Sequence, residues 1–216
     1  MCQWQAIRCA GNVSKEDSVG FSGHLVFARG ERPLLEAPVF DSIDQEPKGT
    51  VQACRPRPGG WQTLRFDHGL WEDDHLLALV EWTGAPACVA HVSDSDVALV
   101  TGLGTDGQRW QAWLNLDRAA ALLAEEPEDL DDVSLWVGTP DFDEAVGRKR
   151  AELEADVPAD AEGALAWAAA AGVPAAAQRA RIEELLHSRE TFAEDLFEAL
   201  LDELGFPRAT EPSPEP

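Results

Sequence analysis

Residues 88–116 read CVAHVSDSDVALVTGLGTDGQRWQAWLNL and contain the clearest fold signals in the sequence. Apolar runs at Cys88–Val92, Val97–Leu103 and Arg109–Leu116 are separated by a Ser-Asp-Ser-Asp segment and by a Thr-Asp-Gly segment. Aspartate and glycine favour tight turns, and an Asp-Gly pair between alternating strands is a strong hairpin signal. Alternate apolar residues of the last run would share one face of a strand. The stretch therefore predicts three antiparallel strands joined by two tight turns.

Further strands are predicted on the amino-terminal side of this stretch. Leu76–Trp82 is an apolar run that ends before a Gly-Ala-Pro turn, so we expect it to begin the meander at about Leu76. Shorter runs bounded by proline and glycine predict three earlier strands, at Leu25–Ala28, Thr50–Cys54 and Trp61–Phe66.

After Leu116 the apolar spacing changes to the helical period of 3.6 residues. Thr139 followed by Pro140 is a helix start signal, and Thr191 with Glu194 matches a capping box. The predicted helices are 118–126, 140–155, 161–171, 175–187 and 192–204.

Strands first and helices afterwards predict an α+β fold, with an antiparallel β-meander in the first half followed by a C-terminal helical part. We expect residues 1–157 to form a mixed antiparallel sheet with one or two helices. A boundary near Val157–Pro158 would leave residues 158–207 as a helical subdomain, and residues 208–216 are expected to be a disordered tail.

The charge of the chain is large and uneven. The 216 residues carry a formal net charge of −23. Seven acidic and eight basic residues in Met1–Arg65 give +1, and 33 acidic and nine basic residues in the remainder give −24. Such a field repels nucleic acid and anionic membranes, and it attracts a cationic partner. Acidity that serves solubility alone is the alternative.

Location and redox state follow from what the sequence lacks. It shows no secretory signal at its start and no apolar run long enough to span a bilayer, so we expect a cytoplasmic protein. The four cysteines, at positions 2, 9, 54 and 88, include no C-x-x-C pair. They are expected to be free thiols rather than disulfides or zinc ligands.

Two motifs could bind a cofactor or a metal ion instead of forming simple turns. Gly102–Gly107 fits G-x-G-x-x-G, which binds a dinucleotide when it opens a helix, but its Asp-Gly pair favours a hairpin. His91, Asp94 and Asp96 could hold a metal ion, but they also fit a polar hairpin turn. The pair of His68 and His75 lacks the spacing of a metal site. We therefore expect no cofactor and no metal.

The last predicted helix is the candidate partner-binding element. Glu194, Glu198 and Asp202 follow one another at four-residue spacing, with Asp195 beside them, and the helix holds no lysine or arginine to offset them. This stripe favours a non-enzymatic, inhibitor- or immunity-like protein that binds a basic protein partner. The alternatives are an enzyme that uses Gly102–Gly107 or the His91, Asp94 and Asp96 turn, and a structural subunit of a larger assembly. The sequence does not give the oligomeric state.

Overall fold

The computed structural model describes residues 20–43, 51–53, 56–67, 71–127, 133–173 and 178–206. The predicted tail at 208–216, His68 and three of the four cysteines lie outside these residues. The fourth, Cys88, is a buried free thiol.

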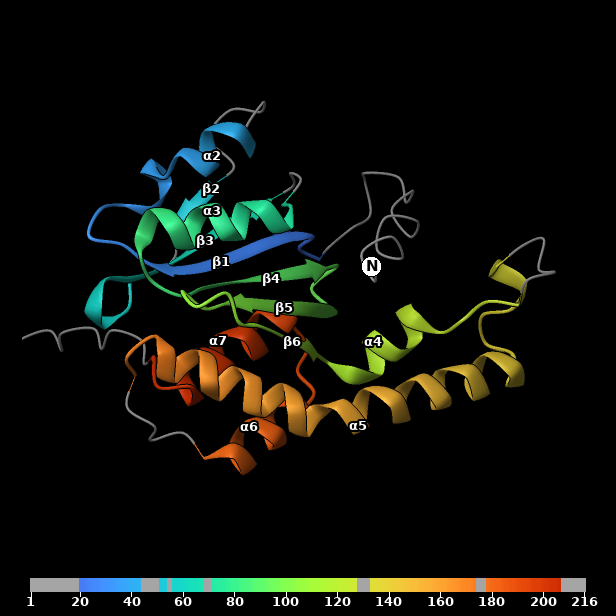
Figure 1. The fold of residues 1–216 in the computed structure, drawn as a ribbon. Coiled ribbons are helices and arrows are strands. Elements are labelled where there is room, and N and C mark those ends of the chain that lie inside the picture. The colour runs from blue at the N-terminus through green and yellow to red at the C-terminus, as the bar shows by residue number, and fades with distance from the viewer. Residues whose placement is uncertain are drawn as a thin grey trace, which may run out of the picture.

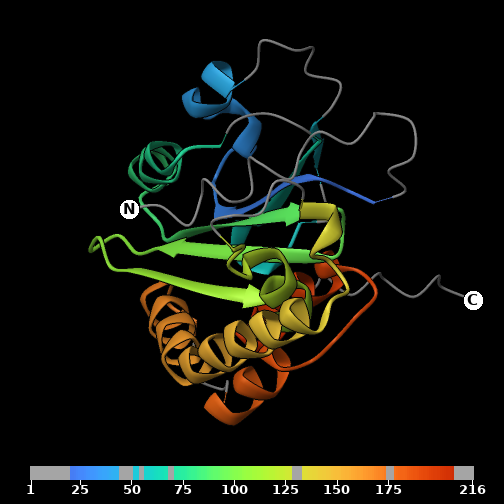
Figure 2. The same cartoon turned by 90° about the vertical axis from the view of Figure 1, so that its right-hand side faces the viewer.

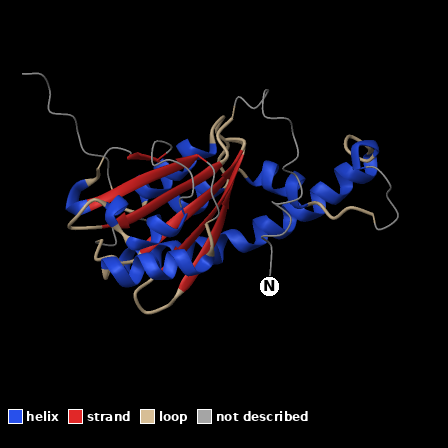
Figure 3. Ribbon diagram, turned by 90° about the horizontal axis from the view of Figure 1, so that it is seen from above, coloured by secondary structure: helices blue, strands red, loops and turns tan. Residues whose placement is uncertain are grey.

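A six-stranded antiparallel sheet is the centre of the molecule (Figures 1 and 3). Its strands lie in the order β2-β3-β1-β4-β5-β6. Their bounds are β1 Gly23–Arg29, β2 Val51–Ala53, β3 Trp61–Asp67, β4 Ala87–Ser93, β5 Val97–Leu103 and β6 Arg109–Leu114. The three strands predicted within residues 88–116 pair as expected, with Ala90 opposite Val100 and Val100 opposite Ala112. The α+β fold class is confirmed.

The predicted strand at Leu76–Trp82 is wrong, because these residues belong to helix α3, Asp73–Thr83. Glu72 and His75 form a reciprocal capping box at its start, and Gly84 in the left-handed conformation ends it. Leu79 is fully buried whereas Leu77 is 43% exposed, which is the pattern of a helix and not of a strand, where both would share one face. The meander therefore begins at Ala87.

Helices cover both faces of the sheet (Figure 2). The helices are α2 Pro38–Ile43, α3, α4 Leu116–Leu123, α5 Pro140–Ala170, α6 Arg179–Leu186 and α7 Ala193–Glu203, with short 3-10 turns at Leu34–Glu36, Pro58–Gly60 and Val133–Leu135. On one face, α2 and α3 pack over Val26, Leu64 and Val89. The four carboxyl-terminal helices contribute to the larger apolar cluster, which includes Phe27.

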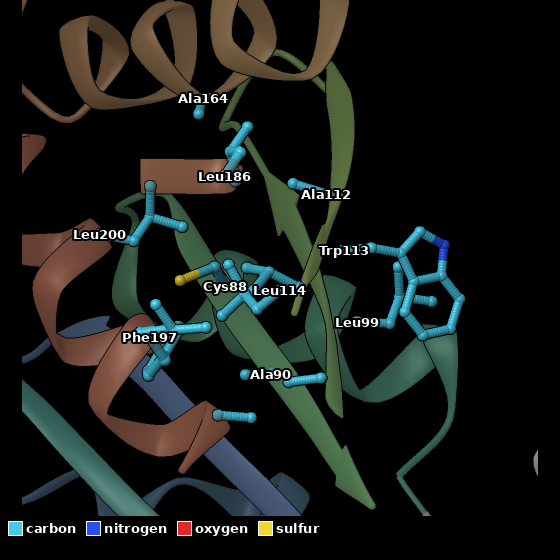
Figure 4. Packing of buried hydrophobic residues seen from close by; sticks show 14 of the residues in the cluster. Cys88, Ala90, Leu99, Ala112, Trp113, Leu114, Ala164, Leu186, Phe197 and Leu200 are labelled. Carbon is cyan, nitrogen blue, oxygen red and sulfur yellow. The ribbon is translucent and has the colours of Figure 1, made fainter. Parts of the chain in front are cut away.

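Side chains of α6 and α7 fill the core on this second face (Figure 4). Phe197 and Leu200 of α7 point toward Cys88, and all three are at most 1% exposed. Trp113 lies on the other side of β6 and is also buried, so both sides of this strand are covered.

Helix α5 replaces two predicted helices with one of 31 residues that passes through Val157 and Pro158. Proline normally breaks a helix because it lacks an N–H and crowds the preceding turn. Here Val157 and Ala161 are 1% and 0% exposed, and a side chain at Gly163 would meet Trp110. Close packing on the sheet keeps the helix continuous. Independent folding of residues 158–207 stays a prediction.

No helix within the described ranges is both long and apolar enough to cross a membrane.

Candidate functional site

Two of the four predicted partner-binding residues are neutralised inside the protein. The guanidinium of Arg57 contacts Glu198 Oε2 at 2.5 Å and also pairs with Asp202. It donates a further hydrogen bond to the carbonyl of Phe206. The Arg57 side chain is 2% exposed, so this cation belongs to the interior. The helix itself holds no lysine or arginine, but Arg57 supplies a balancing cation from 141 residues earlier in the chain.

Aromatic rings surround this ion cluster. Arg57 lies 6.0 Å from the ring centroid of Phe27, which in turn packs 4.9 Å from Trp61 and 5.2 Å from Phe206. A guanidinium in such surroundings is costly unless carboxylates and carbonyls satisfy it. Glu198 and Asp202 therefore hold α7 to the segment before β3.

Glu194 fixes the other end of α7 to the turn between β4 and β5. Its Oε1 accepts a hydrogen bond of 2.8 Å from Ser95 Oγ. The N–H of Ala193 donates to the Ser95 carbonyl at 2.6 Å, and Phe21 N–H donates to Ser95 Oγ at 2.8 Å. The predicted Thr191 cap does not form, since Phe192 occupies the N-cap position with no side-chain bond and Ser95 satisfies the next N–H.

Asp195 is exposed and, alone of the predicted set, lines a groove of about 300 Å³ between α6 and α7. Leu185, Leu196 and Ala199 give the groove an apolar part. Its charged lining consists of four carboxylates and one guanidinium, from Glu184, Glu190, Asp195, Glu203 and Arg181. The groove combines apolar contact area with an excess of negative charge.

The carboxylates of the groove differ in their partners. Arg181 contacts Glu184 at 3.0 Å and Glu203 at 3.2 Å, and its hydrogen bond with Glu203 is the largest cause that raises its pKa. Glu190 and Asp195 make no side-chain ion pair or hydrogen bond with any other described residue. These two negative charges are available to a cation from outside.

The Gly102–Gly107 loop is a hairpin turn between β5 and β6, not the start of a helix. Gly104 N–H donates to the Gln108 carbonyl at 2.9 Å, and Gly107 N–H donates to the Gly104 carbonyl at 3.1 Å. A Cβ at Gly102 would collide with the indole of Trp110. The loop thus lacks the helix that a dinucleotide fingerprint requires.

His91, Asp94 and Asp96 do not form a metal centre. The His91 ring lies edge-on to His24 with centroids 4.7 Å apart, and burial lowers the pKa of both imidazoles, that of His24 to about 4. Asp94 adopts a positive φ of 52° in the turn, and Asp96 faces Arg118 at 3.7 Å. Within the part of the chain that the structure describes, no three His, Cys, Asp or Glu side chains are placed to hold a metal ion.

Comparison of the chain with models of protein families, with curated proteins and with solved structures finds no match.

The contribution of α6 to the groove was not among the predictions from the sequence. A usable signal was present, since the predicted helix at 175–187 carries Glu184 and a short segment joins it to the helix that carries Asp195. Helices joined by a short connection pack side by side, which brings their charged faces together. The pairing of Arg57 with α7 leaves no comparable signal in the sequence.

Proposed function

We propose that this protein is a non-enzymatic binder of a basic protein partner, and that the partner places a lysine or arginine side chain in the groove between α6 and α7. The groove supports this proposal, because its residues Glu190 and Asp195 have no cationic partner among the described residues. A cytoplasmic inhibitor or immunity-like protein would use such a surface.

The chemistry of the groove suits a long cationic side chain. Lysine and arginine place their aliphatic stems against apolar surface while the charged head stays near carboxylates. Leu185 and Leu196 provide that surface, and Asp195 and Glu190 provide the carboxylates. The net charge of −23 adds long-range attraction, which speeds encounter with a basic partner and depends on ionic strength.

The test uses a fluorescein-labelled peptide of alternating lysine and leucine, titrated with the full-length protein and followed by fluorescence anisotropy. The Glu190→Gln, Asp195→Asn double variant removes two groove charges. The Asp74→Asn, Glu81→Gln variant removes two exposed charges from α3, on the opposite side of the sheet, and is the matched control.

We expect the groove variant to bind the peptide about fivefold more weakly, which corresponds to about 1 kcal/mol for two partly screened ion pairs. The control variant should bind within about twofold of the wild type, because only long-range attraction changes. Equal weakening in both variants would mean that the peptide senses net charge alone, and the groove would then have no specific role.

A further inference from the structure

A second pocket, of about 330 Å³, lies where the end of β1, the turn before β3 and the end of α3 meet. Arg29, Arg32 and Trp82 line it together with the backbone of Gly59 and Gly60. The pocket shares no residue with the groove between α6 and α7. Its charge is opposite in sign to that of the groove, because it contains two exposed guanidinium groups and one acidic side chain, that of Glu31.

The two arginines of this pocket lack carboxylate partners within the described ranges. That is unusual in a chain with a net charge of −23, where a cation readily finds a carboxylate. Among the described residues, eight other arginines do pair with carboxylates, namely Arg57, Arg109, Arg118, Arg148, Arg150, Arg179, Arg181 and Arg189. Two arginines left without carboxylates line the same pocket.

Contacts around the pocket hold its walls in place. The Arg32 guanidinium carbon lies 5.1 Å from the ring centroid of Trp82, which is a stacking contact that limits the freedom of this side chain. Gln62 Nε2 donates to the Arg32 carbonyl at 3.0 Å, and Gly30 N–H donates to the Gly60 carbonyl at 3.0 Å. The segment that carries both arginines is thereby tied to β3.

One wall of the pocket consists of glycine backbone without side chains. Gly59 and Gly60 adopt φ values of 81° and 83°, which L side chains rarely adopt. A Cβ at Gly60 would also lie 3.2 Å from the Gly30 carbonyl oxygen and 3.9 Å from Arg29 Cγ. The backbone therefore approaches the arginines without a side chain between them. Glu31 and the carboxyl end of α3 offset part of the positive charge, since a helix carboxyl end carries about half a negative charge.

We propose that this pocket binds the phosphoryl group of a small soluble ligand, with Arg29 and Arg32 donating paired N–H groups to its oxygens. A phosphate monoester carries a charge of about −1.5 to −2 at neutral pH, which two guanidinium groups match. The planar guanidinium of arginine donates to two phosphate oxygens at once. A lysine at the same position, with its compact ammonium group, would bind phosphate less well. The volume suits a ligand of modest size.

Isothermal titration calorimetry with inorganic phosphate, at constant ionic strength, tests the proposal on the full-length protein. The variants are Arg29→Gln with Arg32→Gln, and Arg29→Lys with Arg32→Lys. The matched control is Arg118→Gln with Arg189→Gln, which removes two exposed cations outside the pocket. Circular dichroism of every variant checks that the fold is retained.

We expect saturable binding of phosphate to the wild type with a Kd on the order of 1 mM, and at least about tenfold weaker binding of acetate. The glutamine variant should lose at least about tenfold in affinity, the lysine variant about threefold, and the control should stay within about twofold. No saturable binding to the folded wild type, or equal binding to the glutamine variant, overturns the proposal. Tight binding to phosphatidic acid vesicles without binding of free phosphate would show that the pocket recognises a lipid headgroup and not a small soluble ligand.

Discussion

Replacement of Arg57 by methionine would test how α7 is held to the sheet. The substitution keeps an unbranched side chain that can fill the space of the aliphatic stem, but it removes the guanidinium. Its loss leaves Glu198 and Asp202 without their shared cation and the Phe206 carbonyl without one donor. We expect a marked loss of stability, because the guanidinium is buried beside Phe27, which packs on Trp61.

The magnitude follows from the burial of the three groups. Removing one partner of a fully buried ion pair costs about 3–5 kcal/mol. Arg57 is 2% exposed, but Glu198 and Asp202 are 24% and 39% exposed, so water rehydrates part of each carboxylate after the change. The expected loss in the free energy of unfolding is therefore about 2–3 kcal/mol. For a chain of this length, that lowers Tm by about 5–10 °C.

Urea unfolding followed by tryptophan fluorescence measures the effect. The triple variant Arg57→Met, Glu198→Gln, Asp202→Asn removes the buried cation and both carboxylates together. It should recover to within about 1 kcal/mol of the wild type, since the buried guanidinium and the two carboxylates that it contacts are then all absent. A loss of less than about 0.5 kcal/mol in Arg57→Met, within the scatter of surface substitutions, would show that the Arg57 cluster does not stabilise the fold. A triple variant no more stable than the single one would show that unpaired carboxylates do not cause the loss.

Three further predictions concern the fold. Leu79→Ala should cost about 2–5 kcal/mol and Leu77→Ala less than about 0.5 kcal/mol in urea unfolding, because α3 buries only Leu79; equal costs would support a strand instead. Pro158→Ala should raise stability by about 1–3 kcal/mol, measured as an increase in Tm, because it restores an N–H and removes the ring from the interior of α5; a lower Tm would contradict a continuous helix. Burial lowers the pKa of His24 from 6.5 to about 4, so the unfolded chain takes up a proton at a higher pH than the folded protein does. The free energy of unfolding should therefore fall by about 3 kcal/mol as the pH drops from 6.5 to 4. His24→Phe should remove this part of the pH dependence, and an unchanged profile would show that other groups cause it.

The sheet is predictable from sequence where turn chemistry and alternation agree. Aspartate and glycine between apolar runs identify β4, β5 and β6 correctly, to within two residues at each end. The apolar run Leu76–Trp82 is ambiguous because nearly every residue is apolar, so neither period stands out. Its helix signals are an unusual capping pair, Glu72 with His75, and a terminal Gly84.

The candidate site is only partly predictable, for a physical reason. Local spacing identifies the acidic residues of α7 and places Asp195 beside the stripe. Which carboxylates face inward depends on Arg57 and Ser95, which come from segments far away in the chain. Spacing within one helix carries no information about such partners. The helix continuity at Pro158 has the same origin, because packing against the sheet outweighs the local preference of proline.

We expect a basic partner to contact the carboxylates of the groove between α6 and α7 and not the stripe that Arg57 neutralises. Titration of the 15N-labelled protein with the lysine–leucine peptide, followed by amide chemical shifts, tests it most directly. We expect saturable shifts that centre on Glu190, Asp195 and Ala199, with little change at Asp74 and Glu81 on α3. Shifts spread over acidic residues on both sides of the sheet, with none that saturate in the groove, would contradict it.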